Sequence, residues 1–354
     1  MPDRPGDKRA GASGHELAAD AVSDGPLILG FVLAGATSVG ASWVLVISLE
    51  RVGARLRLSE ALLGVLAALA GDAPEITTAV TALIRHDGNV GAGVVIGSNV
   101  FNIAALIGLA AIIAGRIGLH RRVIELGGVV ALWIALVALA VVTAAVAPAI
   151  GLLLALAVIV PYVTILAVRH ERLARLRLPA SWTGWLVDAV SEEELELEPA
   201  IHPRPGTGRD GVMAASAVLV VVGASIAMER TATRLGSEHD IPGIVVGGLV
   251  LAAVTSLPNA VAAVYLAMRG RGAATLSTAL NSNAFNVIAG LLVPVTILGF
   301  AGQSPQATFV TVFYVGMTVL ALALAYLGRG LSRAAGILIV LAYIAFAALL
   351  IAGA

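Results

Sequence analysis

The chain has 354 residues, of which 59% are hydrophobic and 12% are charged, and its formal net charge is zero. A soluble domain carries about 25% charged residues, so this composition indicates a membrane protein. The balanced charge gives no reason to expect a nucleic-acid partner, and the lack of cysteine excludes disulfides, thiolate metal sites and cysteine catalysis.

Residues 1–25 are polar and rich in Gly, Ala and Asp, and we expect them to form a disordered tail. No short apolar segment with a cleavage site precedes the first long one, so a removed signal peptide is not expected. A membrane-spanning helix needs about 20 apolar residues, and ten such stretches follow the tail. They cover about 26–49, 60–86, 89–114, 122–146, 149–168, 211–235, 241–268, 272–300, 306–327 and 331–352.

One polar interval, residues 169–209, divides these stretches into a first group within 26–168 and a second within 210–354. It contains several arginines and the acidic run 192–198, which we interpret as a solvated surface. Most of the 22 basic residues lie in this interval and in the loops on its side of the membrane. The positive-inside rule therefore predicts a cytoplasmic interval, both termini outside and a multi-pass location in the cytoplasmic (inner) membrane.

The second stretch contains the sequence Gly71-Asp72-Ala73-Pro74-Glu75, which places two carboxylates and a proline at membrane depth. A carboxylate there is costly and is usually retained because it contacts an ion, a proton or a partner. The proline removes a helix donor and frees backbone carbonyls, which can act as ligands. Asp72 and Glu75 are therefore predicted to bind a hard cation, and the alternative is a protonated structural carboxyl.

Two clusters of neutral oxygens lie in the third and eighth stretches, at Gly97-Ser98-Asn99-Val100-Phe101-Asn102 and at Asn281-Ser282-Asn283-Ala284-Phe285-Asn286. Residues four apart share a helix face, and within each cluster such a pair is predicted to line the ion site. Asn99 and Asn283 are expected to bond the broken backbone. Helix–helix contact is the alternative role for such groups. The predicted lining residues are Ser98, Asn102, Ser282 and Asn286.

The two clusters are related by 184 positions (97 against 281), and the same offset relates Pro74 to Pro258 and Glu75 to Asn259. Upstream, the pair Glu50-Arg51 is echoed by Glu229-Arg230 at a slightly different spacing. Five spans per copy is an odd number, so the two copies must insert with opposite topology. Inverted repeats with broken helices and a site at the midplane are typical of secondary transporters.

The second proline motif offers uncharged oxygens. Its hydroxyl and amide groups suit sodium or a water that carries a proton. The residues concerned are Thr255, Ser256 and Asn259.

Together these motifs resemble the signatures of the cation/calcium exchanger superfamily, which includes the sodium/calcium exchangers. The signatures read Gly-Thr-Ser-x-Pro-Glu and Gly-Ser-Asn-x-x-Asn, and the resemblance covers about 26–352. It implies a ten-helix inverted-repeat fold in which the first and sixth spans slide over a fixed core. The sequence departs from the family where Gly71-Asp72 replaces Thr-Ser and where Asn259 replaces the second acid. Both carboxylates therefore come from the first repeat.

The sequence thus predicts an all-α membrane protein with ten transmembrane helices, arranged as two inverted five-helix repeats with helices broken at the midplane. The expected function is secondary antiport, not enzyme catalysis, exchanging Na+ (or H+) for Ca2+. No cofactor is expected; the partners are inorganic cations and the lipid bilayer, and a monomer satisfies these patterns. The alternatives are a Na+/H+ exchanger in which Glu75 titrates, and a non-transporting sensor or scaffold on a degenerate exchanger fold. The predicted ion-site residues are Asp72, Glu75, Ser98, Asn102, Thr255, Ser256, Asn259, Ser282 and Asn286.

Overall fold

A computed structural model describes residues 12–56, 68–167, 206–299 and 304–353 of the chain. Nearly all of these residues are helical, and one short pair of strands joins two loops. The predicted interval 169–209 lies almost wholly outside the described residues. The helices are α1 (Ala12–Arg55), α3 (Ala73–Ile84), α4 (Gly88–Asn102), α5 (Ala110–Ala114), α6 (Arg121–Val142), α7 (Pro148–Ala167), α10 (Gly208–Glu238), α11 (Gly243–Val245), α12 (Ala252–Thr255), α13 (Leu257–Met268), α14 (Gly272–Phe285), α15 (Val293–Leu298), α16 (Pro305–Gly328) and α17 (Arg333–Ala352). Three π-helical segments, η1 (Ile103–Leu109), η2 (Val246–Leu251) and η3 (Asn286–Leu292), and two strands, β1 (Arg116–Gly118) and β2 (Gly330–Ser332), complete the described elements.

Eight helices in the described part of the chain are long and apolar enough to cross a membrane. A ninth span results if the helical segments 243–255 and 257–268, which meet at a bend of 49°, are counted together. The predicted second stretch, 60–86, is described only from residue 68, and its α3 is a short apolar helix. The predicted tail also differs in part, because α1 already begins at Ala12. The Ala, Glu and Leu residues that follow have high helix propensity, which favours this extension.

Several helices begin where a side chain replaces a missing backbone acceptor. Asp87 accepts a hydrogen bond from the Val90 amide at 3.2 Å at the start of α4. Ser304 and Ser332 accept in the same way at the starts of α16 and α17. The first amides of a helix have no intrahelical partner, so these caps fix where each helix starts.

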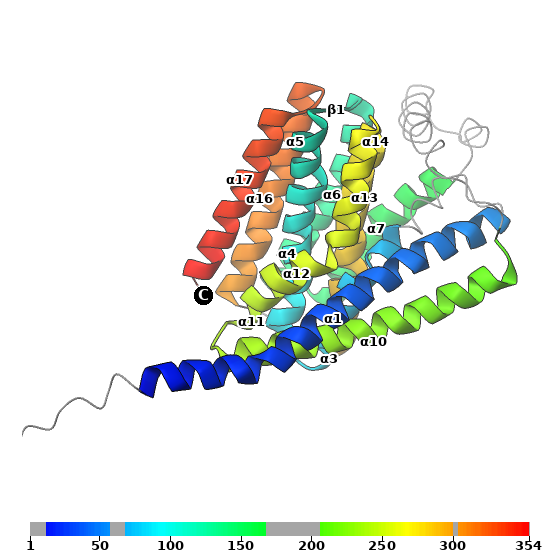
Figure 1. The fold of residues 1–354 in the computed structure, drawn as a ribbon. Coiled ribbons are helices and arrows are strands. Elements are labelled where there is room, and N and C mark those ends of the chain that lie inside the picture. Colours follow the sequence, from blue (N-terminus) through cyan, green and yellow to red (C-terminus); the bar gives the residue numbers. More distant parts are fainter. Residues whose placement is uncertain (1–11, 57–67, 168–205, 300–303, 354) are drawn as a thin grey trace, which may run out of the picture.

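The helices α1 and α10 run antiparallel as a pair that lies diagonally across the remaining helices (Figure 1). At one end of the pair Arg51 forms an ion pair with Asp210 at 3.2 Å, and at the other end His239 contacts Asp24 at 2.7 Å. In the buried middle the hydroxyls of Ser38 and Ser225 lie 3.1 Å apart. Because these contacts join the two helices along their length, we treat them as one unit, the α1–α10 unit.

The loops gather in two groups. In one group β1 pairs antiparallel with β2, and Gly272 at the start of α14 packs against the Gly118 backbone. In the other group Ser304 donates to Asn89 at 3.1 Å, and Gly243 approaches Asp87. This is the grouping that the predicted alternation of spans requires.

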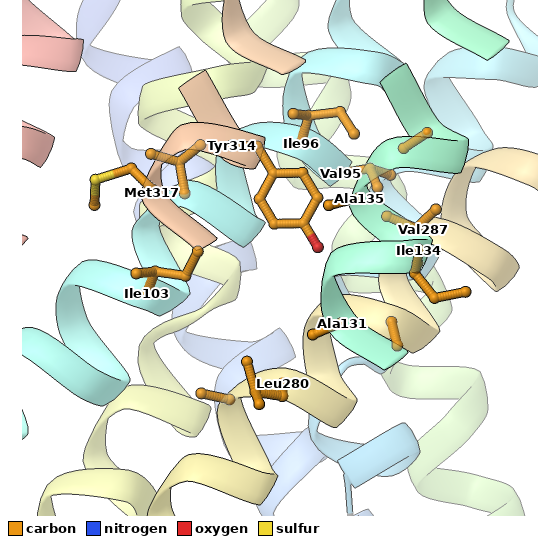
Figure 2. Packing of buried hydrophobic residues seen from close by; sticks show 14 of the residues in the cluster. Val95, Ile96, Ile103, Ala131, Ile134, Ala135, Leu280, Val287, Tyr314 and Met317 are labelled. Atoms are coloured by element: carbon orange, nitrogen blue, oxygen red, sulfur yellow. The ribbon is translucent and has the colours of Figure 1, made fainter. Parts of the chain in front are cut away.

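The centre of the fold is apolar and closely packed around α4, which is buried along nearly all its length. Figure 2 shows the ring of Tyr314, from α16, among Ile96, Ile103 and Val287. Tyr314 is fully buried. The core therefore places a phenol in the interior beside the helices that carry the Ser-Asn clusters.

Gly97 lets α4 cross η2 at backbone contact. A Cβ atom there would lie 2.7 Å from the carbonyl carbon of Gly248, which has no flexible side chain to move away. Gly97→Ala should therefore destabilise the protein by about 1–3 kcal/mol, the usual cost of overpacking, and lower the midpoint of thermal unfolding in detergent. The matched control is Gly316→Ala, since nothing lies within 4 Å of that position. Equal midpoints for the two variants would contradict this packing.

Candidate ion-binding site

Each proline motif lies at the start of a helix. Asp72 precedes α3 with φ −80° and ψ −6°, and Ser256 precedes α13 with φ −83° and ψ −5°. Pro74 and Pro258 fall in the first turns, where their missing N–H is tolerated. The two motifs therefore have the same local backbone, as their equal spacing from the Ser-Asn clusters predicts.

Pro74 leaves the carbonyl of Ala70 without its helical donor. The buried hydroxyl of Ser42, in α1, donates to this oxygen at 2.9 Å and reaches Gly71 O at 3.5 Å. The carbonyl freed by Pro74, which the sequence predicts can act as an ion ligand, thus also forms a contact between α1 and the start of α3.

Asp72 and Glu75 are buried, with exposed fractions of 0% and 1%. Among the described residues, neither carboxylate forms an ion pair with Arg, Lys or His. A buried charge is costly unless it is compensated, and in the described part of the chain these two acids have no cationic side chain to compensate them.

The hydrogen-bond donors to both carboxylates come from the second half of the chain. The Asp72 Oδ1 atom accepts from Asn259 Nδ2 at 2.7 Å and from Ser282 Oγ at 2.5 Å. The Glu75 Oε2 atom accepts from Asn286 Nδ2 at 2.5 Å, and its Oε1 accepts from the Ser256 hydroxyl. The first half thus supplies the two carboxyl groups, and the second half supplies side-chain donors that orient them.

Asn102 joins this network from α4. Its amide donates to Ser282 Oγ at 3.2 Å and to Asn283 Oδ1 at 3.1 Å. Asn99 donates to the Asn283 carbonyl at 3.0 Å, and Asn283 donates to the Asn99 carbonyl at 3.1 Å. The expectation that Asn99 and Asn283 bond the backbone freed at the proline breaks is therefore wrong. They bond each other's helix, because α4 and α14 meet face to face.

Two predicted residues lie outside the network. Thr255 donates to the Leu251 carbonyl of its own helix at 2.9 Å. The Ser98 hydroxyl is buried and has no partner among the described residues. The structure thus brings the other predicted residues together and leaves these two apart: the connected residues are Asp72, Glu75, Asn102, Ser256, Asn259, Ser282 and Asn286.

Three acceptor oxygens of the network remain unused. Asp72 Oδ2, Asn102 Oδ1 and Asn286 Oδ1 are buried and accept no hydrogen bond in the described part of the chain. A carboxylate and two amide oxygens are hard neutral or anionic donors of the kind that Ca2+ and related cations take as ligands. All three belong to residues that the sequence predicts to line the ion site.

The departures from the exchanger signature are connected in space. A Cβ atom on Gly71 would overlap the Asn259 side-chain oxygen, so this amide occupies the room that a threonine would need. The Nδ2 atom of the same amide bonds Asp72. The three changes at positions 71, 72 and 259 therefore form one local arrangement.

The loops after the two half-helices also match. Arg85 (φ −81°, ψ 7°) ends α3 as Arg269 (φ −87°, ψ 5°) ends α13. Each is followed by a residue with positive φ, His86 at 62° and Gly270 at 72°. The Ser-Asn clusters likewise both run into π-helical segments, η1 and η3, a feature frequent near functional sites.

Solved structures share this fold. The H+/Ca2+ exchanger CAX superposes with a TM-score of 0.66 at 16% identity, covering 92% of this chain and 85% of that one. Native YfkE gives 0.63 at 16% identity, covering 96% and 98%. A structure of the sodium-calcium exchanger NCX_Mj gives 0.59 at 22% identity, covering 90% and 97%. At these identities the likeness concerns the fold alone.

Curated proteins match over a shorter region. Sodium/potassium/calcium exchanger 3 of Rattus norvegicus is 42% identical over 71 residues, which are 20% of this chain and 11% of that protein. Sodium/potassium/calcium exchanger 4 of Homo sapiens is 40% identical over a region of the same length and coverage. The match thus spans about a ninth of these relatives.

The family model described as sodium/calcium exchanger protein matches residues 26–171 and 211–352, which covers both halves of the chain and the motifs in each. With the apolar helices described above, this indicates a multi-pass membrane protein. The chain belongs to the sodium/calcium exchanger family.

Proposed function

We propose that this protein is a secondary cation antiporter of the cytoplasmic membrane, and not an enzyme, that exchanges Na+ or H+ for Ca2+ at the Asp72–Glu75 pair. The observation that carries the proposal is this buried pair, with its donors from the second half and without a basic partner among the described residues. Family membership supports cation exchange as the reaction. The transported ions are substrates, and no cofactor takes part.

Charge balance gives the site a reason to exchange. Two buried carboxylates are compensated equally by one Ca2+, by two Na+ or by two protons, and leaving them uncompensated costs several kcal/mol per charge. The bound Ca2+ must therefore leave before Na+ ions or protons bind, and these must leave before Ca2+ binds again. The proposal predicts that one Ca2+ is exchanged for two monovalent charges.

The fold proposed for this reaction is the ten-span arrangement with two inverted repeats. The matched backbone angles at Asp72 and Ser256, and at Arg85 and Arg269, support equivalent halves. The reciprocal bonds of Asn99 and Asn283, 184 positions apart, support their relation by a twofold axis. The half-helices α3 and α13 would then approach the site from opposite sides.

The orientation can be tested separately. A reporter fused after Gly206 should lie in the cytoplasm, and one at the C terminus should lie outside, because most basic residues are on the side of the interval 169–209. Side-specific labelling of the two fusions in intact cells checks this. If both reporters lay on the same side, the inverted-repeat arrangement would be ruled out.

The proposed reaction is tested by flux in proteoliposomes with one gradient applied at a time. An outward Na+ or H+ gradient should drive uphill Ca2+ uptake. The counter-ion is the one whose gradient drives this uptake. Coupled Na+ and H+ movement without Ca2+ would favour a Na+/H+ exchanger. No flux under any gradient would favour a non-transporting protein on the exchanger fold.

A further inference from the structure

Polar contacts at two places tie the α1–α10 unit to the rest of the described protein, and both places lie on the segment that carries the acids. At the beginning of α3, Ser42 of α1 bonds the Ala70 carbonyl. At its end, Glu229 of α10 pairs with Arg85 at 3.4 Å. The half-helix with Glu75 is thus held at both ends by the unit.

Glu229 is well enclosed. Its side chain is 1% exposed, and its two oxygens accept from Arg85 and, at 3.3 Å, from Thr233. Arg85 is the residue that ends α3. Removing a partner from a buried carboxylate is costly, so this pair favours the position of α10 seen here.

The sequence contains a counterpart of each member of this pair. Arg269 ends α13 with the backbone angles of Arg85. Glu50-Arg51 in α1 echoes Glu229-Arg230 in α10. The counterpart of the Arg85–Glu229 pair is therefore an Arg269–Glu50 pair, at the opposite end of the α1–α10 unit.

That second pair is open in this structure. The Arg269 guanidinium lies over the Tyr265 ring, 5.0 Å from its centroid. Glu50 is partly exposed, and among the described residues its carboxylate forms no ion pair or hydrogen bond. The buried acid, Glu229, is thus paired, while the partly buried Glu50 has no partner among the described residues.

We propose that Arg85–Glu229 and Arg269–Glu50 are alternative ion pairs, made one at a time as the α1–α10 unit moves between two positions. Glu229 and Glu50 are positioning residues in this account, which rests on the proposed exchange function. Because the unit contacts α3 at both ends, its position is coupled to Asp72 and Glu75. The structure shows the state in which the Arg85 pair is closed.

The test measures proximity, so it needs no transport activity. The chain has no cysteine, so Arg85→Cys with Glu229→Cys, and Glu50→Cys with Arg269→Cys, give two clean variants for a short bifunctional thiol crosslinker. Thiols consumed by the crosslinker can no longer react with a mass tag. The loss of tagging in membranes therefore measures the crosslink yield. Both pairs should crosslink, each in its own variant.

Each yield should respond to the other pair. Adding Glu50→Gln to the 85/229 variant should raise its yield, and adding Glu229→Gln to the 50/269 variant should raise that yield. The expected change in the population ratio is about two- to fivefold, as for the loss of one ion pair. The control is Glu238→Gln, which breaks the surface Arg234–Glu238 pair inside α10 and should change neither yield.

A purely structural role for Glu229 would not alter crosslinking at the opposite end of the unit. The proposal would be overturned if the 50/269 variant gave no crosslink either with or without Glu229→Gln. It would also be overturned if removing the competing acid lowered either crosslink yield or left it unchanged. A protein that shows these shifts but carries no ion flux would overturn the exchange function while leaving the alternating pairs standing.

Discussion

Glu75→Gln is expected to abolish cation exchange while leaving the fold intact. The amide has the same shape but lacks the charge, and it places an NH2 group against Asn286 Nδ2 or the Ser256 hydroxyl, both of which donate to the carboxylate here. A hydrogen bond to a charged group is worth about 1.5–3 kcal/mol, so ion affinity should fall by at least about tenfold. Ca2+ flux into proteoliposomes measures the loss.

The matched control is Glu238→Gln, which makes the same chemical change at an exposed position on α10. It should exchange ions at the wild-type rate. Undiminished exchange by Glu75→Gln, with normal elution of the purified variant, would make Glu75 a structural carboxyl.

Asp72→Ser is expected to impair cation binding, and the further change Asn259→Glu is expected to recover part of it. The two side chains touch, since Asn259 Nδ2 donates to Asp72 Oδ1 at 2.7 Å. The double variant restores two carboxylates and places one in each half of the chain. Residues in contact couple by about 0.5–3 kcal/mol, which a double-mutant cycle of ion affinity resolves.

Strictly additive effects would show that positions 72 and 259 do not share an ion. Asp72 would then serve only to hold Asn259 and Ser282, and the site would operate with one carboxylate. A site with a single carboxylate would favour Na+ or H+ over Ca2+. The cycle therefore tests the charge-balance argument as well as the contact.

The sequence predicts which polar residues meet because its signals are chemical and repeated. Two carboxylates at membrane depth with a proline between them, and two Ser-Asn clusters at a common offset, indicate which residues meet. The structure brings Asp72 and Glu75 together with four donors from the second half. Family membership was also indicated by these motifs.

Other features depend on geometry that no motif encodes. The orientation of a hydroxyl decides whether it faces the site, so Thr255 bonds its own helix while Ser256 bonds Glu75. Ser42 and Glu229 lie in helices whose composition is otherwise ordinary for a membrane protein. Their contacts with the α3 segment arise from how the α1–α10 unit crosses it, which only the assembled fold defines.

We propose above that the buried Asp72–Glu75 pair binds the transported cation. The most direct measurement is Ca2+ titration of the purified, ion-depleted protein by calorimetry, compared with the variant carrying Asp72→Asn and Glu75→Gln. We expect saturable Ca2+ binding by the wild type, with competition by Na+ or by acid, and loss of this binding in the double variant. Equal Ca2+ affinity in both proteins would contradict it.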